Sequence, residues 1–211
     1  MKRLIVVGVL ALLFGAHGIA NGQEPERRHI EVSGDADAAQ YIPEGEVIVY
    51  GVDFSKVQIY GAKESAEQFA NAFVAINALF VSQPEKYDCS GLLQKQCVVY
   101  TYPTDRLVGS INWQYAMCSN GKPQMYPVGD MIRAYQLPHK EGIGLVFIAW
   151  LLDKAHDTAY YDVVCFDIKT RTVLFDTTTS GRAGGFSLRN FWANSVYKII
   201  SNRALRKQIE L

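Results

Sequence analysis

The sequence lacks the long hydrophobic run of a transmembrane helix. Its longest apolar stretches, 4–14 and 143–152, have eleven and ten residues, whereas a helix needs about 20 apolar residues to cross a bilayer. An excess of basic charge is also missing, because 21 Lys and Arg side chains face 21 Asp and Glu side chains. Nucleic-acid binders need such an excess to displace counterions from phosphates. We therefore expect neither a transmembrane span in the mature chain nor nucleic acid as a partner.

Motifs that specify a chemical reaction are missing as well. The sequence contains no G-x-S-x-G elbow, no P-loop, no G-x-G-x-x-G fingerprint and no C-x-x-C pair, which removes the usual signatures of hydrolases, nucleotide-binding proteins and zinc or redox sites. The four histidines do not stand at metal-ligand spacing. We expect no cofactor and no metal.

Cysteines are few: Cys89, Cys97, Cys118 and Cys165. An even number in an exported chain permits disulfides, and four cysteines allow three pairings. We expect at most one disulfide, with Cys89–Cys97 preferred because these residues are close in sequence. Cys165 lies within an apolar strand-like segment, which favours a buried thiol.

The first residues have the pattern of a secretory signal peptide. Lys2 and Arg3 precede the apolar run, and small residues follow at 18–20, as in a basic region, a hydrophobic region and a cleavage site. We expect residues 1–20 to be a signal peptide, 21–42 a flexible leader and 43–211 one domain. The chain would be exported, either periplasmic or secreted. Because no cysteine stands near the cleavage site, we expect no lipid anchor there.

Two strands and a helix are predicted in the first half of the domain. Apolar residues alternate on both faces over 47–52, and strand character continues over 57–60. Ser65 and Gln68 have the spacing of a capping box. The apolar face of the following helix recurs every three or four residues, at Phe69, Phe73, Ile76 and Phe80. Pro84 would end this helix.

The middle of the chain gives weaker signals. Residues 97–102 and 108–117 are rich in β-prone side chains and are predicted as strands. A short helix over 130–136 would begin near Asp130 and end before Pro138.

The C-terminal part predicts a three-stranded antiparallel meander followed by a helix. The strands are expected over 143–152, 160–168 and 172–178, and the helix from about Leu188. Glycines at 181–185 connect the two. The whole pattern predicts an α+β fold: a single-domain two-layer α/β sandwich with a mostly antiparallel sheet and packed amphipathic helices.

One polar cluster contains Asp and His residues, which are common in catalytic sites. Asp153, His156 and Asp157 fall together in a predicted hairpin turn, and His139 is the other histidine that could join them. Polar residues collect in such turns without any catalytic role, so we favour a structural interpretation. Hydrolysis of an unknown substrate is the enzymatic alternative, and carriage of a small apolar ligand in an interior cavity is a second one.

A resemblance adds to this interpretation. The segments VDFSKV at 52–57, FDIKT at 166–170 and GGFSLRNFWA at 184–193, with the Phe69 helix between them, look like uncharacterised exported proteins of Bacteroidetes. More remotely, the strands, glycine loop and final helix are similar to envelope modules of the TolB amino-terminal and curli-secretion-channel type. That resemblance implies an α/β sandwich used for assembly and protein contact.

The sequence therefore favours a non-catalytic exported module for protein interaction or assembly in the cell envelope. Its partner would be an envelope protein or a second copy of this chain. The expected contact surface is the outer strand of the meander, because uncharged polar residues follow one another there: Thr172, Thr177, Thr178 and Thr179.

Overall fold

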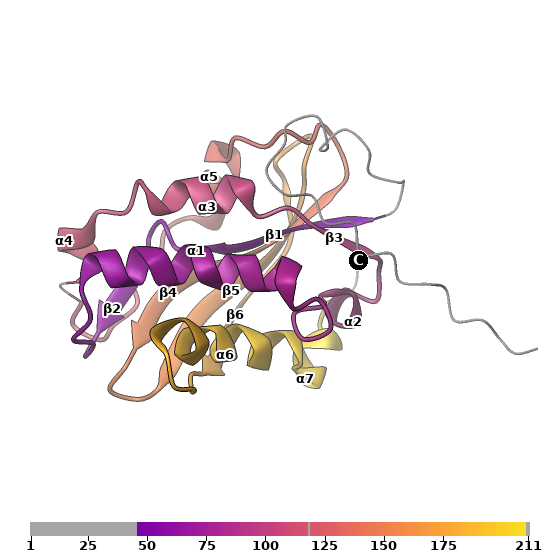
Figure 1. Cartoon of the computed structure of the whole chain (residues 1–211). Helices are drawn as coiled ribbons and strands as arrows, with labels where there is room; N and C mark the ends of the chain where they lie inside the picture. The colour runs from indigo at the N-terminus through magenta and orange to yellow at the C-terminus, as the bar shows by residue number, and fades with distance from the viewer. Residues whose placement is uncertain (1–45, 118, 210–211) are drawn as a thin grey trace, which may run out of the picture.

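The computed structural model describes residues 46–117 and 119–209. The expected signal peptide and flexible leader, and Cys118, lie outside the described residues. The described chain forms one mixed sheet of six strands with helices packed on it (Figure 1). The α+β class predicted from the sequence is confirmed. The strands are β1 (Val47–Asp53), β2 (Gln58–Tyr60), β3 (Cys97–Val99), β4 (Ile143–Asp153), β5 (Thr158–Asp167) and β6 (Val173–Arg182).

The sheet combines a parallel half and an antiparallel half. Its order is β3-β1-β4-β5-β6, and β2 pairs with β4 beyond the end of β1. Strand β1 runs parallel to both β3 and β4, while β4, β5 and β6 form the predicted antiparallel meander. Parallel neighbours need long crossover connections, and the helices between β2 and β4 provide them. Strand β4 is the central strand and is buried over nearly its whole length.

Two long helices cover one face of the sheet. Helix α1 (Ala66–Ser82) begins with the predicted capping box, in which Ser65 and Gln68 each bond the other's backbone amide. Helix α6 (Leu188–Ile200) begins at Ser187, whose side chain accepts a hydrogen bond from the Asn190 amide. The two helices lie side by side on this face and contact each other (Figure 1). The predicted apolar face of α1 is fully buried there: Phe69, Phe73, Ile76 and Phe80.

A second, smaller core lies on the opposite face. Helix α5 (Val128–Ala134) covers it with Met131 and Ile132, and Tyr135 follows at the end of the helix. Helix α5 is the short helix predicted over 130–136, and it begins two residues earlier than expected. Strands with apolar side chains on both faces, such as β1 and β4, are explained by these two cores.

The prediction of a strand over 108–117 was wrong. This region contains the last residue of one short helix, α3 (Tyr102–Val108), and the whole of another, α4 (Trp113–Ala116). Pro103 stands in the first turn of α3. A proline is tolerated there because the backbone amides of a first turn have no carbonyl partner within the helix. The Asn112 side chain caps α4 by accepting from the Tyr115 amide. Local capping therefore outweighs the β propensity of the aromatic and branched residues.

Two further short helices were not predicted. Helix α2 (Ser90–Leu93) follows α1, and α7 (Arg203–Arg206) follows α6. The final helix predicted from about Leu188 ends at Ile200, and Asn202 caps α7 with its side chain. The basic residues of the tail thus belong partly to a separate helix.

Candidate functional site

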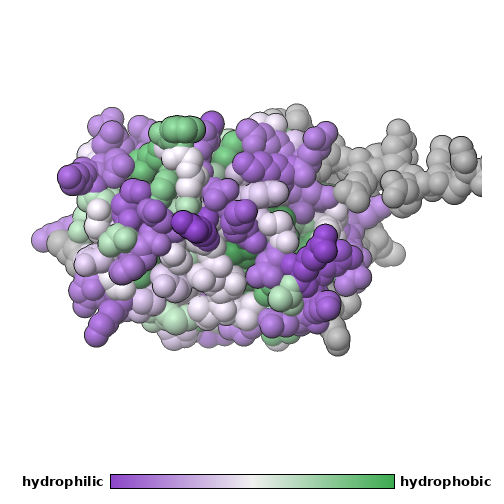
Figure 2. Space-filling model, turned by 90° about the horizontal axis from the view of Figure 1, so that it is seen from below, coloured by the Kyte–Doolittle hydropathy of each residue, from purple (hydrophilic) through white to green (hydrophobic). Residues whose placement is uncertain are grey.

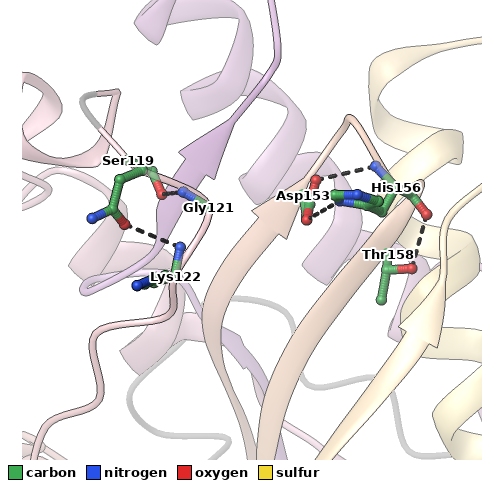
Figure 3. Close-up of polar contacts among 7 residues, drawn as sticks. Ser119, Gly121, Lys122, Asp153, His156 and Thr158 are labelled. Atoms are coloured by element: carbon green, nitrogen blue, oxygen red, sulfur yellow. Dashed lines mark hydrogen bonds and ion pairs between the residues drawn. The ribbon is translucent and has the colours of Figure 1, made fainter.

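The hairpin between β4 and β5 brings Asp153 and His156 together, as Figure 3 shows. The Nδ1 atom of His156 lies 2.7 Å from Oδ2 of Asp153, and the His156 amide donates to Oδ1 of the same carboxylate. The Asp153 side chain is buried, whereas that of His156 is 73% exposed. A buried carboxylate that orients an exposed imidazole is one part of an acid–base site.

The remaining parts of a hydrolytic site are absent from this hairpin. Among the described residues, only Asp153 is hydrogen-bonded to the His156 ring. Asp157 forms an ion pair with Lys154, with its Oδ1 atom 3.1 Å from Nζ. The Thr158 hydroxyl donates to the His156 carbonyl. The cluster therefore contains no side chain placed as a nucleophile next to the imidazole.

A serine turn also appears in the same view (Figure 3). Ser119 accepts a hydrogen bond from the Gly121 amide, and the Asn120 side chain accepts one from the Lys122 amide. Such bonds are typical of a tight turn. Gly121 has a positive φ and lies against the Tyr60 ring. The Ser119 hydroxyl thus stabilises a turn that packs on β2.

His139 does not join the cluster. Its Nδ1 atom is 2.9 Å from the Tyr50 hydroxyl, and its ring lies edge-on to Tyr100. The Tyr50 ring lies beside Gly144, near the start of β4, while Asp153 ends that strand. The two histidines therefore lie near opposite ends of β4. At about 3.3 Å per residue, this places them roughly 30 Å apart. The four-residue constellation proposed from the sequence is therefore not assembled.

The outer strand of the meander is an edge strand. Strand β6 pairs with β5 on one side, and no other described strand pairs with it on the other side. It has ten residues, whereas seven were predicted over 172–178: it begins one residue later and extends four residues further, into the glycine-rich connector.

The register shows which backbone groups of β6 point outward. The Ala183 amide donates to the Asp157 carbonyl, and in an antiparallel pair the bonded positions alternate with non-bonded ones. The residues opposite Tyr160, Asp162 and Val164 therefore direct their N–H and C=O groups away from β5. They are Ser180, Thr178 and Asp176. Arg182 belongs to the same set, and its carbonyl accepts a hydrogen bond from Asn194 of α6.

The four threonines predicted for the edge have different roles. Thr178 is exposed, and its backbone N–H and C=O groups point away from β5. Its hydroxyl donates a hydrogen bond to Oδ1 of the buried Asp162 at 2.6 Å. Thr177 and Thr179 are half-buried on the side of α6 and bond to β5 through their backbones. Thr172 is not part of the edge: it lies in the β5–β6 turn, where its hydroxyl accepts from Thr170.

The exposed side chains of β6 are of mixed character: Leu174, Asp176, Thr178, Ser180 and Arg182. Figure 2 views the molecule from below, the side on which α6 lies in Figure 1. Pale side chains of intermediate hydropathy gather in the middle of this view, with hydrophilic ones around them. Exposed side chains of β6 alternate with half-buried ones along almost the whole strand.

A cavity that the sequence did not predict lies at the start of β6. It has a volume of about 530 Å³ and is lined by the first residues of α5 and by residues of the β5–β6 turn. Its polar lining includes Arg133, Thr170, Arg171, Thr172 and Asp176. This lining differs from the apolar interior that a carrier of apolar ligands needs. In the sequence, residues 169–171 read as a simple turn, and only the tertiary structure brings α5 next to it.

The predicted disulfide between Cys89 and Cys97 is not present, because both residues are free thiols. The Cys89 Sγ contacts the Tyr87 carbonyl and the Cys97 Sγ contacts the Lys95 carbonyl. Cys165 is a buried free thiol, as predicted. Burial raises the pKa of Cys97 and of Cys165 to about 12, so neither is a reactive thiolate near neutral pH.

Comparison with known proteins adds no relative: no protein-family model, curated protein or solved structure matches this chain. Within residues 46–117 and 119–209, no group of three or more His, Cys, Asp or Glu side chains is placed to hold a metal ion. None of the helices in the same ranges is both long and apolar enough to cross a membrane.

Proposed function

We propose that this protein is a non-catalytic, exported module of the cell envelope that binds another protein, or a second copy of itself, through the edge of β6. The observation that carries the proposal is a ten-residue edge strand with one side on which no strand of residues 46–117 or 119–209 pairs. An extended segment can add to such an edge through main-chain hydrogen bonds. The resemblance to assembly modules of the envelope favours the same function.

The outward backbone groups define where the partner would pair. Asp176, Thr178 and Ser180 offer N–H and C=O groups at every second position, which is the spacing that a further strand requires. Natural edges are often blocked by charged side chains, prolines or bulges. Strand β6 has a bulge near its start, between Cys165 and Phe166 of the partner strand, but its centre is regular and contains three successive threonines.

A proline at Thr178 tests this proposal. Thr178→Pro removes one outward amide without removing a bond to β5, and prolines are tolerated on the open side of edge strands. Thr178→Val is the matched control, because it also loses the bond to Asp162 but keeps the amide. The measurement is affinity capture from crosslinked envelope extracts, with light scattering of the purified protein for self-association.

We expect wild type and Thr178→Val to capture the same partners, or to form the same oligomer, and Thr178→Pro to lose them. Retention of the same partners by Thr178→Pro would overturn the edge as the contact surface. A wild-type protein that stays monomeric and captures nothing would overturn the interaction function.

A further inference from the structure

The exposed side chains of β6 include one charge of each sign. Asp176 lies in the first half of the strand, Arg182 is its last residue, and both are exposed. Neither side chain forms an ion pair with another described residue. Arg133 and Arg171 line the same cavity as Asp176, but no ion pair joins either of them to it. Both charges of the edge can therefore pair with a molecule that lies along β6.

The two charges cannot reach each other within one chain. They are six positions apart along β6, which places their Cα atoms roughly 20 Å apart at about 3.4 Å per residue. Positions that differ by an even number lie on the same face of a strand. Asp176 and Arg182 therefore share a face with the uncharged side chains of Thr178 and Ser180, which lie between them.

The backbone between the two charges is open for pairing. The outward N–H and C=O groups of Asp176, Thr178 and Ser180 form no hydrogen bond with any described residue. The carbonyl of Arg182, in contrast, already accepts a hydrogen bond from Asn194. The open part of the edge is thus centred on Thr178.

A second copy of the chain fits this edge when it runs antiparallel. With a two-fold axis beside Thr178, that residue faces Thr178 of the second copy, and Asp176 faces Ser180. Facing residues at bonded positions exchange both of their backbone hydrogen bonds. Arg182 follows Ser180 on the same face, so it lies diagonally across from Asp176, within reach of a long side chain. The axis repeats this contact, and both charges of each copy find a partner.

The same charges disfavour a parallel arrangement. A parallel second copy in register would place Asp176 next to Asp176 and Arg182 next to Arg182, and like charges that face each other are destabilising. The antiparallel arrangement uses the same surface on both copies, and such a contact closes as a dimer. The charge pattern of β6 is therefore complementary to itself in one orientation.

We propose that two copies of this chain associate by antiparallel pairing of their β6 strands, centred on Thr178, with Asp176 of each copy beside Arg182 of the other. This inference rests on the proposed contact function of the β6 edge and names its partner. A contact limited to one strand from each copy is small, and small interfaces are weak and transient. We therefore expect a Kd of about 10–100 μM.

Charge reversal with rescue tests this pairing. The measurement is sedimentation velocity of the purified mature chain over a concentration series up to about 500 μM, at low ionic strength. Asp176→Lys and Arg182→Glu each replace two attractive contacts of the dimer by two repulsive ones. We expect either variant alone to associate about tenfold more weakly than wild type, or less. An equimolar mixture of the two variants restores opposite charges at both contacts and should associate as wild type does.

Arg203→Glu is the matched control, because it reverses an exposed arginine on α7. It should dimerise as wild type does, and its mixture with Asp176→Lys should not restore association, which separates a specific contact from attraction between oppositely charged proteins. The double variant Asp176→Lys/Arg182→Glu should dimerise by itself, because its charges are exchanged rather than removed. Circular dichroism of each variant verifies that it is folded.

The outcomes separate this inference from the proposed function. A wild-type chain that stays monomeric at every concentration, yet captures a partner that Thr178→Pro loses, overturns the second copy as partner and leaves the contact function of the edge intact. A dimer that neither reversal weakens, or that the mixture of Asp176→Lys and Arg182→Glu does not restore, overturns the antiparallel pairing. A dimer that Thr178→Pro also forms overturns both the pairing and the edge as the contact surface.

Discussion

At the scale of single residues, His139 shows how burial decides the state of a side chain. Its ring is buried between Tyr50 and Tyr100, and this burial lowers its pKa from 6.5 to about 4. The imidazole is therefore neutral above about pH 4. Because the pKa of Tyr50 is raised by burial, its hydroxyl stays protonated, and it forms a hydrogen bond with Nδ1 of His139 at 2.9 Å.

This pairing predicts a loss of stability in acid. Between about pH 6.5 and 4 the unfolded chain binds a proton at His139 that the folded chain does not bind. Stability should therefore be full above about pH 6.5 and fall as the pH drops through this window, by on the order of 3 kcal/mol. Denaturant unfolding at a series of pH values measures the slope.

His139→Gln should remove this contribution, because glutamine keeps an acceptor for Tyr50 but does not titrate. His156→Gln is the control, since His156 is exposed. The carboxyl of Asp105, whose pKa is raised by burial, contributes a slope of opposite sign that both variants share. An acid slope in His139→Gln as steep as in wild type would contradict the assignment.

At the scale of elements, helix α1 derives its position from one apolar face. Phe73 lies at the centre of that face, fully buried, and stacks on Phe54 with ring centroids 3.9 Å apart. Burial of such a ring contributes roughly 1.5–3 kcal/mol before cavity effects. This contact attaches the helix to the segment between β1 and β2.

We therefore expect Phe73→Ala to lower the free energy of unfolding by about 3–5 kcal/mol. Val74→Ala is the matched control on the next position, because Val74 is 43% exposed, and it should change the value by less than about 0.5–1 kcal/mol. Chemical denaturation of both variants measures the difference. Equal midpoints for Phe73→Ala and wild type would remove this face from the core.

Elements with strong periodicity could be predicted, and those set by local capping could not. Apolar residues every three or four positions indicate a helix at α1, and the unbroken apolar run indicates a buried strand at β4. Residues 108–117 contain the same β-prone types, yet Asn112 caps a helix there, and α3, with Pro103 in its first turn, ends at Val108. A single capping bond contributes about 1 kcal/mol, which is enough to decide a four-residue element.

At the scale of the whole molecule, the main core keeps Cys89, Cys97 and Cys165 reduced. Cys89 and Cys165 are members of that core, and Cys97 packs against it. Burial is the main cause that raises the pKa of each thiol. Disulfide formation requires a thiolate, so a folded protein with these pKa values resists oxidation at these sites.

We expect the folded protein to unfold at the same Tm with and without dithiothreitol. Cys89 and Cys97 should both be alkylated in denaturant without prior reduction, and only slowly under native conditions at pH 8. Peptide mapping by mass spectrometry checks this. A Cys89–Cys97 cross-linked peptide from the purified protein would show that the pair oxidises after all.

The sequence by itself determined the α+β class, the meander and the two long helices, because these depend on patterns that repeat within a few residues. The tertiary structure alone decided that β1 lies between two parallel neighbours and that Thr178 has an outward amide. It also separated His139 from Asp153 and placed Arg171 beside α5. These relations join residues far apart in the chain, and pairing across a sheet or packing of a helix on a turn leaves no local pattern in the sequence.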